Sequence, residues 1–181
     1  MKHANSVDYE IRLAEAADAH AIADMSRELI EHGLERSWTA ARVARSIRHR
    51  GSTVIKAVVD VARVASSMGD SAVGRSGMDN SAPAGFAIMT FADESAHLSL
   101  LAVGREYRRL AIARHMLTWL ERTAVCAGTF FVRLEVRAAN RGAAEFYRAV
   151  GYDEADLIEG YYNGVEDALV FAKDLRVCDI T

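Results

Sequence analysis

The stretch "REYRRLAIARHML", residues 105–117, joins three closely spaced arginines to the start of an amphipathic helix. From its middle onward, apolar residues recur at the spacing of a helix face, at Leu110, Ile112, Met116, Leu117 and Leu120. The first turn of a helix leaves amide N–H groups unpaired and carries about half a positive charge, so each basic side chain there is unfavourable by about 0.3–1 kcal/mol. Arg105, Arg108 and Arg109 therefore indicate that an anionic group belongs at this end of the helix.

The residues that surround this helix start favour a phosphate group as the anion. The strand-like run "LLAV", residues 100–103, leads through "GREYRR" into the helix and would present backbone N–H groups there. Small side chains at Ala111 and Ala113 would let a ligand approach the backbone closely. Spacing alone leaves a second interpretation open, in which this is a solvated basic turn and the alanines serve helix propensity.

The rest of the chain alternates between strand and helix patterns. Runs rich in β-branched or alternating apolar residues predict strands at 9–14, 53–60, 84–93, 96–103 and 129–137, and two more within 152–175. Helical spacing predicts helices at 18–33, 37–51, 141–150 and from the quoted stretch to about residue 127. The two apolar runs from 84 to 103 should pair as a hairpin. The order indicates a mixed sheet in which antiparallel hairpins flank a strand–helix–strand crossover.

Residues that stop helices or form turns separate these elements. Glycines are expected to end three of the helices, at Gly33, Gly128 and Gly151. Asn140 is expected to cap the last helix, and Asn163 with Gly164 suits a tight turn between the last two strands. Residues 61–83 lose all periodicity and fill with Ser, Gly and Asp, so we expect a long surface loop that ends at the chain's only proline, Pro83.

The length of 181 residues is typical of one domain, and we expect a single domain over residues 1–181. The 51% of hydrophobic residues is enough to build its core. A net charge of −3 gives no general reason to bind nucleic acid or an anionic membrane. Cys126 and Cys178 share no metal-ligand spacing, and neither do the scattered histidines, so we expect no metal and two free thiols in a reducing compartment, the cytoplasm. No run matches a signal peptide or a membrane span. A monomer or a homodimer would satisfy these observations.

The stretch "VGREYRRLAIARHML", residues 103–117, resembles the acyl-CoA pyrophosphate loop of the GNAT acetyltransferase superfamily, Arg/Gln-x-x-Gly-x-Gly/Ala. Arg108, Ala111 and Ala113 occupy its marked positions, and Ala111 stands where the family usually has glycine. The resemblance implies an α/β fold with a mixed, mostly antiparallel sheet, flanking helices and a splayed strand pair for acetyl-CoA. It implies contacts to acetyl-CoA from Leu101, Ala102, Val103, Arg108, Arg109, Leu110, Ala111, Ile112, Ala113 and Asn140.

Two further stretches, "LEVRAANRGAAEFYRAVGY" (134–152) and "YYNGVEDALVF" (161–171), are similar to the ribosomal-protein alanine N-acetyltransferases within that superfamily. The similarity runs in register from about Ala96 to Leu175. It implies direct transfer of an acetyl group to a primary amine, with the α-amine of a peptide or protein N-terminus as the acceptor. An acetyltransferase for small amines and a non-catalytic acyl-CoA-binding module stay open as alternatives.

The strand "FVRLEVR" alternates apolar and charged residues, so that Glu135 stands between Arg133 and Arg137 on one face. From the residues alone, this is either an exposed sheet face with ion pairs or the border of a site. The resemblance implies that Glu135 is the general base. The flanking arginines would then lower its pKa.

Three tyrosines also have two interpretations. Tyr147 has the spacing of a buried helix stripe, whereas the resemblance implies that it protonates the departing CoA thiolate. Tyr161 and Tyr162 would pack against each other across a hairpin, whereas the resemblance implies that at least one closes over the acceptor substrate. Cys126 follows the helix pattern, and we expect it in the core.

Overall fold

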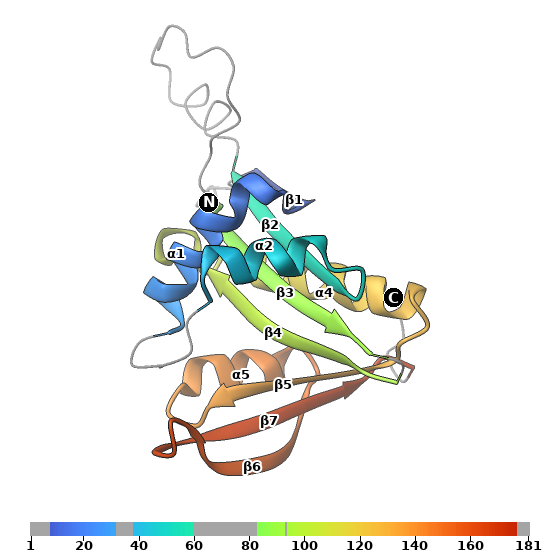
Figure 1. Ribbon diagram of the computed structural model, residues 1–181. Helices are drawn as coiled ribbons and strands as arrows, with labels where there is room; N and C mark the ends of the chain where they lie inside the picture. Colours follow the sequence, from blue (N-terminus) through green and yellow to red (C-terminus); the bar gives the residue numbers. More distant parts are fainter. Residues whose placement is uncertain (1–7, 32–37, 60–82, 93, 177–181) are drawn as a thin grey trace, which may run out of the picture.

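The computed structural model describes residues 8–31, 38–59, 83–92 and 94–176, which form one seven-stranded sheet with helices on both faces (Figure 1). The strands are β1 (Tyr9–Leu13), β2 (Ser52–Val59), β3 (Gly85–Phe91), β4 (Ala96–Val103), β5 (Phe131–Arg137), β6 (Asp153–Tyr162) and β7 (Glu166–Asp174). The helices of these residues are α1 (Ala19–Leu29), α2 (Ala40–Arg48), α4 (Ile112–Cys126) and α5 (Arg141–Ala149), with short 3-10 turns η1 (Ala16–Asp18) and η2 (Arg105–Tyr107). The α/β fold class expected from the sequence is confirmed.

The sheet has the strand order β1-β2-β3-β4-β5-β7-β6. Every neighbouring pair is antiparallel except β4 and β5, which are parallel and joined through α4. The predicted hairpin between β3 and β4 and the predicted crossover are therefore confirmed. Parallel pairing of β4 with β5 covers only Ala96 with Val132 and His97 with Arg133, and beyond this point the two strands diverge (Figure 1).

A register shift in β4 accompanies this divergence. Leu100 pairs with Ile88 and Leu98 pairs with Met89, so Ser99 has no partner of its own on β3. Such a bulge bends a strand and reverses the alternation of its side chains. Accordingly, Leu98 packs in the core beside α4, whereas Leu100 packs in the core beside α1 and α2.

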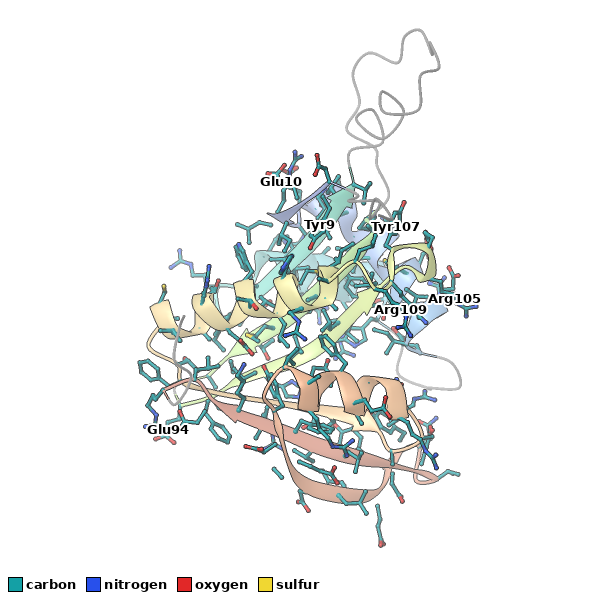
Figure 2. All side chains as sticks on the ribbon, turned by 180° about the vertical axis from the view of Figure 1, so that it is seen from behind. Tyr9, Glu10, Glu94, Arg105, Tyr107 and Arg109 are labelled. Carbon is teal, nitrogen blue, oxygen red and sulfur yellow. The ribbon has the colours of Figure 1, made fainter. Side chains whose placement is uncertain are left out.

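Two apolar clusters hold the helices against the sheet. One cluster joins the inner faces of α4 and α5 to the sheet, and both helices lie on the near face in Figure 2. The other joins α1 and α2 to the opposite face of β2, β3 and β4. On β5, Val132, Leu134 and Val136 are buried in the first cluster, so that Glu135 and its neighbouring arginines lie on the other face.

The predicted helix and turn signals are largely confirmed. Asn140 caps α5 by accepting a hydrogen bond from the Ala143 N–H at 3.1 Å. Gly128 and Gly151, just after α4 and α5, have φ of 81° and 86°. Asn163 and Gly164, with φ of 55° and 72°, make the turn between β6 and β7. The predicted stop at residue 33, the second cysteine at 178 and the expected loop at 61–83, apart from the buried Pro83, lie outside the described residues.

The expectation that Cys126 belongs to the core is wrong. The buried stripe of α4 consists of Ile112, Met116, Leu117, Leu120 and Ala124. Cys126 follows Ala124 by two residues, about 200° around the helix, and is a free thiol on the exposed side. In the part of the chain that is described, no helix is both long and apolar enough to cross a membrane.

Candidate active site

The turn before α4 has an unusual backbone. Helix α4 begins at Ile112, two residues later than the apolar pattern, so the arginines predicted at the helix start precede its first turn. Arg109 and Ala111 have φ of 65° and 60°, in the left-handed region that side chains other than glycine rarely adopt. Ala111 is the N-cap residue and its methyl group cannot accept a hydrogen bond from the helix. The N–H groups of the first turn are thus available to a ligand.

Positive charge surrounds this uncapped helix end. Arg105, Arg108 and Arg109 are exposed, and Figure 2 shows Arg105 and Arg109 on the turn that leads into α4. No acidic residue lies in the first turn of α4. Two electrostatic contributions, the helix dipole and the arginines, therefore favour an anion at the same place.

The divergence of β4 from β5 exposes one edge of β4. Leu101, Ala102 and Val103 pair with β3 on one side, while the pairing with β5 has already ended at His97. Along a strand, successive N–H groups point alternately to the two neighbouring strands. Some backbone N–H groups of this segment therefore face the gap between β4 and β5, as the resemblance requires for binding a thioester carbonyl.

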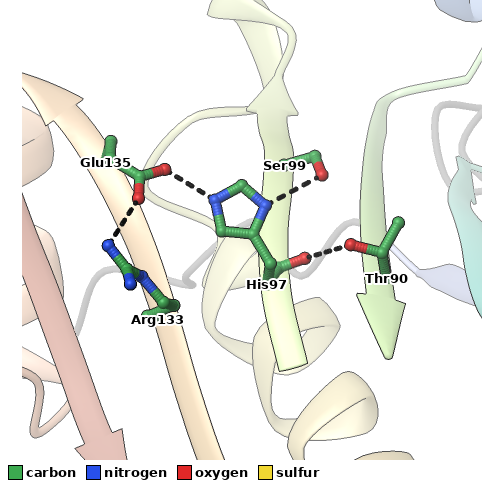
Figure 3. A network of polar contacts seen from close by, with 5 residues as sticks. All are labelled: Thr90, His97, Ser99, Arg133 and Glu135. Carbon is green, nitrogen blue, oxygen red and sulfur yellow. Dashed lines mark hydrogen bonds and ion pairs between the residues drawn. The ribbon is translucent and has the colours of Figure 1, made fainter. Parts of the chain in front are cut away.

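Glu135 lies where the two strands part. Its carboxylate accepts hydrogen bonds from His97 Nε2 at 2.6 Å and from an Arg133 guanidinium nitrogen at 3.3 Å (Figure 3). The hydrogen bond from His97 is the largest cause that lowers the pKa of Glu135; burial opposes it, and the charges of His97 and Arg133 add to it. Arg137 instead pairs with Glu166 at 3.1 Å. The prediction that flanking arginines lower this pKa is therefore confirmed for Arg133, but His97 has the larger effect.

The sequence interpretation did not include His97 among the candidate residues. The signal was present, because strand alternation places His97 and Ser99 together on the polar face of β4. The crossover then places that strand beside β5, so a histidine near its start could have been expected to face Glu135.

Tyr147 is buried in α5 among other aromatic rings. Its ring lies 5.2 Å from Phe146, 5.6 Å from Tyr152 and 5.9 Å from Phe171, measured between ring centroids. Burial, followed by the nearby Tyr162, raises the pKa of its phenol well above the ordinary value. Tyr147 is thus a core aromatic, as its spacing predicted, and a phenol that holds its proton firmly.

Tyr162, at the end of β6, interacts electrostatically with residues of both β5 and α5. Its ring stands edge-on to that of Tyr161 at 4.9 Å, and Tyr161 is 47% exposed. Burial, the neighbouring Tyr161 and the charge of Glu135 raise the pKa of Tyr162 to about 12. Tyr162 interacts electrostatically with Glu135, and it also raises the pKa of Tyr147. Asn140 is engaged as the α5 cap, and Tyr161 contacts Tyr162 at the outer edge of the site.

Residues 69–152 match the model of the acetyltransferase (GNAT) family. This part of the chain is therefore similar to the GNAT acetyltransferases. The matched range includes the diverging strands, Glu135 and Tyr147, whereas Tyr161 and Tyr162 lie beyond it.

Two curated relatives are similar to parts of this chain. The chain is 39% identical over 67 residues to the N-terminal acetyltransferase B complex catalytic subunit naa20 of Schizosaccharomyces pombe, covering 37% of each chain. It is 34% identical over 96 residues to the ribosomal protein bS18 alanine N-acetyltransferase of Escherichia coli strain K12, covering 51% of this chain and 65% of that protein. The chain thus spans less than two thirds of the length of these curated relatives.

The likeness in fold extends over nearly the whole chain. The crystal structure of Arabidopsis thaliana NAA60 in complex with acetyl-CoA superposes with a TM-score of 0.71, at 15% identity over 93% of this chain and 99% of that one. The chain therefore shares its overall fold with this structure.

Proposed function

We propose that this protein is an acetyl-CoA-dependent N-acetyltransferase that moves the acetyl group directly to a primary amine. The observation that carries the proposal is the divergence of β4 from β5, with Glu135 on β5 next to the last paired residues. The uncapped, arginine-rich amino end of α4 at the far end of β4 supports it. The family match and the acetyl-CoA complex of NAA60 point to the same chemistry.

The residues at the amino end of α4 fit the diphosphate of acetyl-CoA. The N–H groups of its first turn would receive phosphate oxygens, and Arg108 and Arg109 would balance their charge. Leu110, Ala111, Ile112 and Ala113 form the surrounding backbone, and Asn140 is proposed to contact acetyl-CoA from the start of α5. Backbone N–H groups of Leu101, Ala102 and Val103 would stabilise charge that develops on the thioester oxygen.

Proton transfer is divided between Glu135 and Tyr147. The Glu135 carboxylate promotes removal of a proton from the acceptor amine. Tyr147 donates a proton to the CoA sulfur. A phenol of ordinary pKa near 10 is a weak acid toward a thiolate whose thiol has a pKa near 8.5, and burial of Tyr147 widens the gap. Burial also destabilises an uncompensated thiolate, which raises the pKa of the departing thiol and narrows the gap from the other side.

We propose an N-terminal α-amine as the acceptor. Such an amine, with a pKa of about 7.7–8.0, costs about 1 kcal/mol to deprotonate at pH 7, whereas a lysine near 10.4 costs about 4.6 kcal/mol. A carboxylate whose pKa is lowered, such as Glu135, is a weak base and suits the first substrate. Both curated relatives are named as enzymes that act on protein N-termini or on ribosomal-protein alanine. Tyr161 and Tyr162 would contact the first residues of the peptide.

The cellular compartment is part of the proposal. A chain of 181 residues that uses two cysteines, one of them the free Cys126, is typical of a reducing compartment. We propose the cytoplasm, where ribosomal and other new N-termini are present.

The test is acetyl transfer to defined peptides. The full chain is mixed with acetyl-CoA and short peptides of varied first residue, and the release of free thiol is followed. Each peptide has a matched control with a blocked α-amine and one internal lysine. We expect transfer to the free α-amine only, and Tyr147→Phe should lower kcat with little change in acetyl-CoA affinity. No thiol release with any peptide or small amine would contradict the proposal.

One observation favours a second candidate function. Ala111 adds a methyl group and backbone strain where the family usually has glycine, which is compatible with an acyl-CoA-binding module that has lost efficient transfer. Calorimetry separates the two functions. Tight CoA binding with no turnover on a broad amine panel would favour the module.

A further inference from the structure

A histidine connects β4 to β5 at the point where they begin to diverge. Nε2 of His97 lies 2.6 Å from Glu135 Oε2, and its Nδ1 lies 3.2 Å from Ser99 Oγ (Figure 3). The side chain of His97 is 39% exposed, whereas that of Glu135 is 10% exposed. Of the two groups, the imidazole is the one that an incoming amine reaches more easily.

The partners of His97 determine where its hydrogen lies. An ionised carboxylate only accepts hydrogen bonds, so Nε2 carries the hydrogen in the contact with Glu135. Nδ1 of the neutral ring is then an acceptor, and the Ser99 hydroxyl donates to it. The basic lone pair is therefore on Nδ1, and the fixed negative charge of Glu135 lies at Nε2. A carboxylate placed in this way orients an imidazole and stabilises its protonated form.

The charged groups around His97 are few. Glu135 on β5 contacts His97 directly. Arg133, on the same strand, contacts the same Glu135 carboxylate. Strand β3 holds no titratable side chain, and it contributes the Thr90 hydroxyl, which donates to the backbone oxygen of His97 at 3.4 Å. The buried faces of α1 and α4, the helices that contact β4, carry no titratable group. Among the described residues, Glu135 is thus the charged group in direct contact with His97.

Glu135 is poorly suited to take the proton alone. One of its oxygens accepts from His97 and the other from Arg133, so both are already engaged. These contacts stabilise the ionised carboxylate and reduce its basicity. An imidazole, by contrast, exchanges protons near neutral pH, where an α-amine must be deprotonated.

We propose, on the basis of the N-acetyltransferase function argued above, that His97 is the proton acceptor of the transfer and Glu135 a positioning residue that orients its ring. The bound α-ammonium carries three protons. One stays on the amide nitrogen as the C–N bond forms. A second leaves nitrogen to solvent, and solvent returns one proton to Tyr147 after its phenol has protonated sulfur as the C–S bond breaks. The third passes through the Ser99 hydroxyl, which takes it from nitrogen and gives its own proton to Nδ1. The imidazolium then returns its proton to solvent.

The experiment compares His97→Gln with the wild-type chain, using acetyl-CoA and the best acceptor peptide of the panel. We expect kcat at pH 7 to fall by about 10²–10⁴, the usual contribution of a positioned base. The acidic limb of the kcat profile should move to higher pH, toward the ordinary amine pKa of about 7.7–8.0, because the amine must then lose its proton unaided. Acetyl-CoA affinity by calorimetry should be unchanged. Ser99→Ala should lower kcat in the same direction.

His20→Gln is the matched control, since His20 is exposed on α1 and its loss should leave kcat and the profile unchanged. If Glu135 were itself the acceptor, His97→Gln would leave that carboxylate and a donor to it in place, and kcat at pH 7 would stay within about threefold of wild type. That result would overturn the inference. A wild-type chain that acetylates no amine would instead contradict the proposed function.

Discussion

Ala111 is a residue whose backbone favours a different amino acid. Its φ of 60° and ψ of 6° place it in the left-handed region, where a side chain beyond glycine costs about 1–2 kcal/mol. Arg109, two residues earlier, has a similar φ of 65°. The chain thus maintains two strained residues at the turn that precedes α4, where the diphosphate of acetyl-CoA is proposed to bind. Strain of this kind is retained where the surrounding structure requires it.

Ala111→Gly should relieve part of this strain. We expect the free energy of unfolding in urea to rise by about 0.5–1 kcal/mol. Glycine adopts positive φ without the steric strain of alanine, and the relief of this strain exceeds the greater entropy that glycine loses on folding. We also expect tighter acetyl-CoA binding by calorimetry, because the methyl group is removed from the turn. Ala113→Gly, inside α4, is the matched control and should lower stability by about 1 kcal/mol. A less stable Ala111→Gly protein would show that this turn is not strained.

At the scale of elements, the end of α1 is tied to the start of α2 by a buried carboxylate. Glu31, 6% exposed, accepts hydrogen bonds from the Ser26 hydroxyl at 2.6 Å and from the Trp38 N–H at 2.9 Å. Trp38 in turn supports α2, since the guanidinium of Arg42 lies 3.9 Å from its ring centroid. These contacts hold the two helices that cover β2, β3 and β4.

Glu31→Ala should loosen this pair of helices. It leaves the Trp38 N–H and the Ser26 hydroxyl without their shared acceptor, and we expect a loss of about 2–4 kcal/mol in the free energy of unfolding measured in urea. Glu28→Ala, which removes an exposed carboxylate from the same helix, should change stability by less than about 0.5 kcal/mol. Equal stability of the two variants would contradict the role given to Glu31.

At the scale of the whole molecule, the sheet arranges the site. The crossover through α4 makes β4 and β5 neighbours, and their pairing ends after two residues, so that the gap opens beside Glu135. The last two strands, β6 and β7, then bring Tyr162 within electrostatic range of Glu135 and Tyr147. This order of strands places β4 beside β5, and β5 beside β7.

Hydrogen exchange can locate acyl-CoA binding across the whole chain. Addition of CoA should slow the exchange of backbone amides in residues 98–103 and in the first turn of α4, because the ligand would then occupy N–H groups that lack a protein partner. Amides of α1 are the internal control and should exchange at unchanged rates. Protection confined to other segments would place the ligand elsewhere and contradict the site proposed here.

Much of this arrangement could be predicted from the sequence. The hairpin of β3 and β4, the crossover through α4, the Asn140 cap and the turn at Asn163 and Gly164 follow from local patterns, and the structure confirms each. Two predictions about α4 needed correction. The helix starts later than its apolar stripe, and Cys126 faces solvent, because helical spacing specifies a face only to within a residue or two near the helix ends.

The sequence by itself determined the elements, the apolar faces and the position of the basic turn, since these depend on neighbours within a few residues. Only the tertiary structure decided that His97 donates to Glu135, which lies 38 positions later in the chain, and that Arg137 turns away to Glu166. It also decided the left-handed backbone of Ala111, which the local sequence opposes. The physical reason is that side-chain pairing across strands depends on register and bulges, and these are set by packing of the whole sheet.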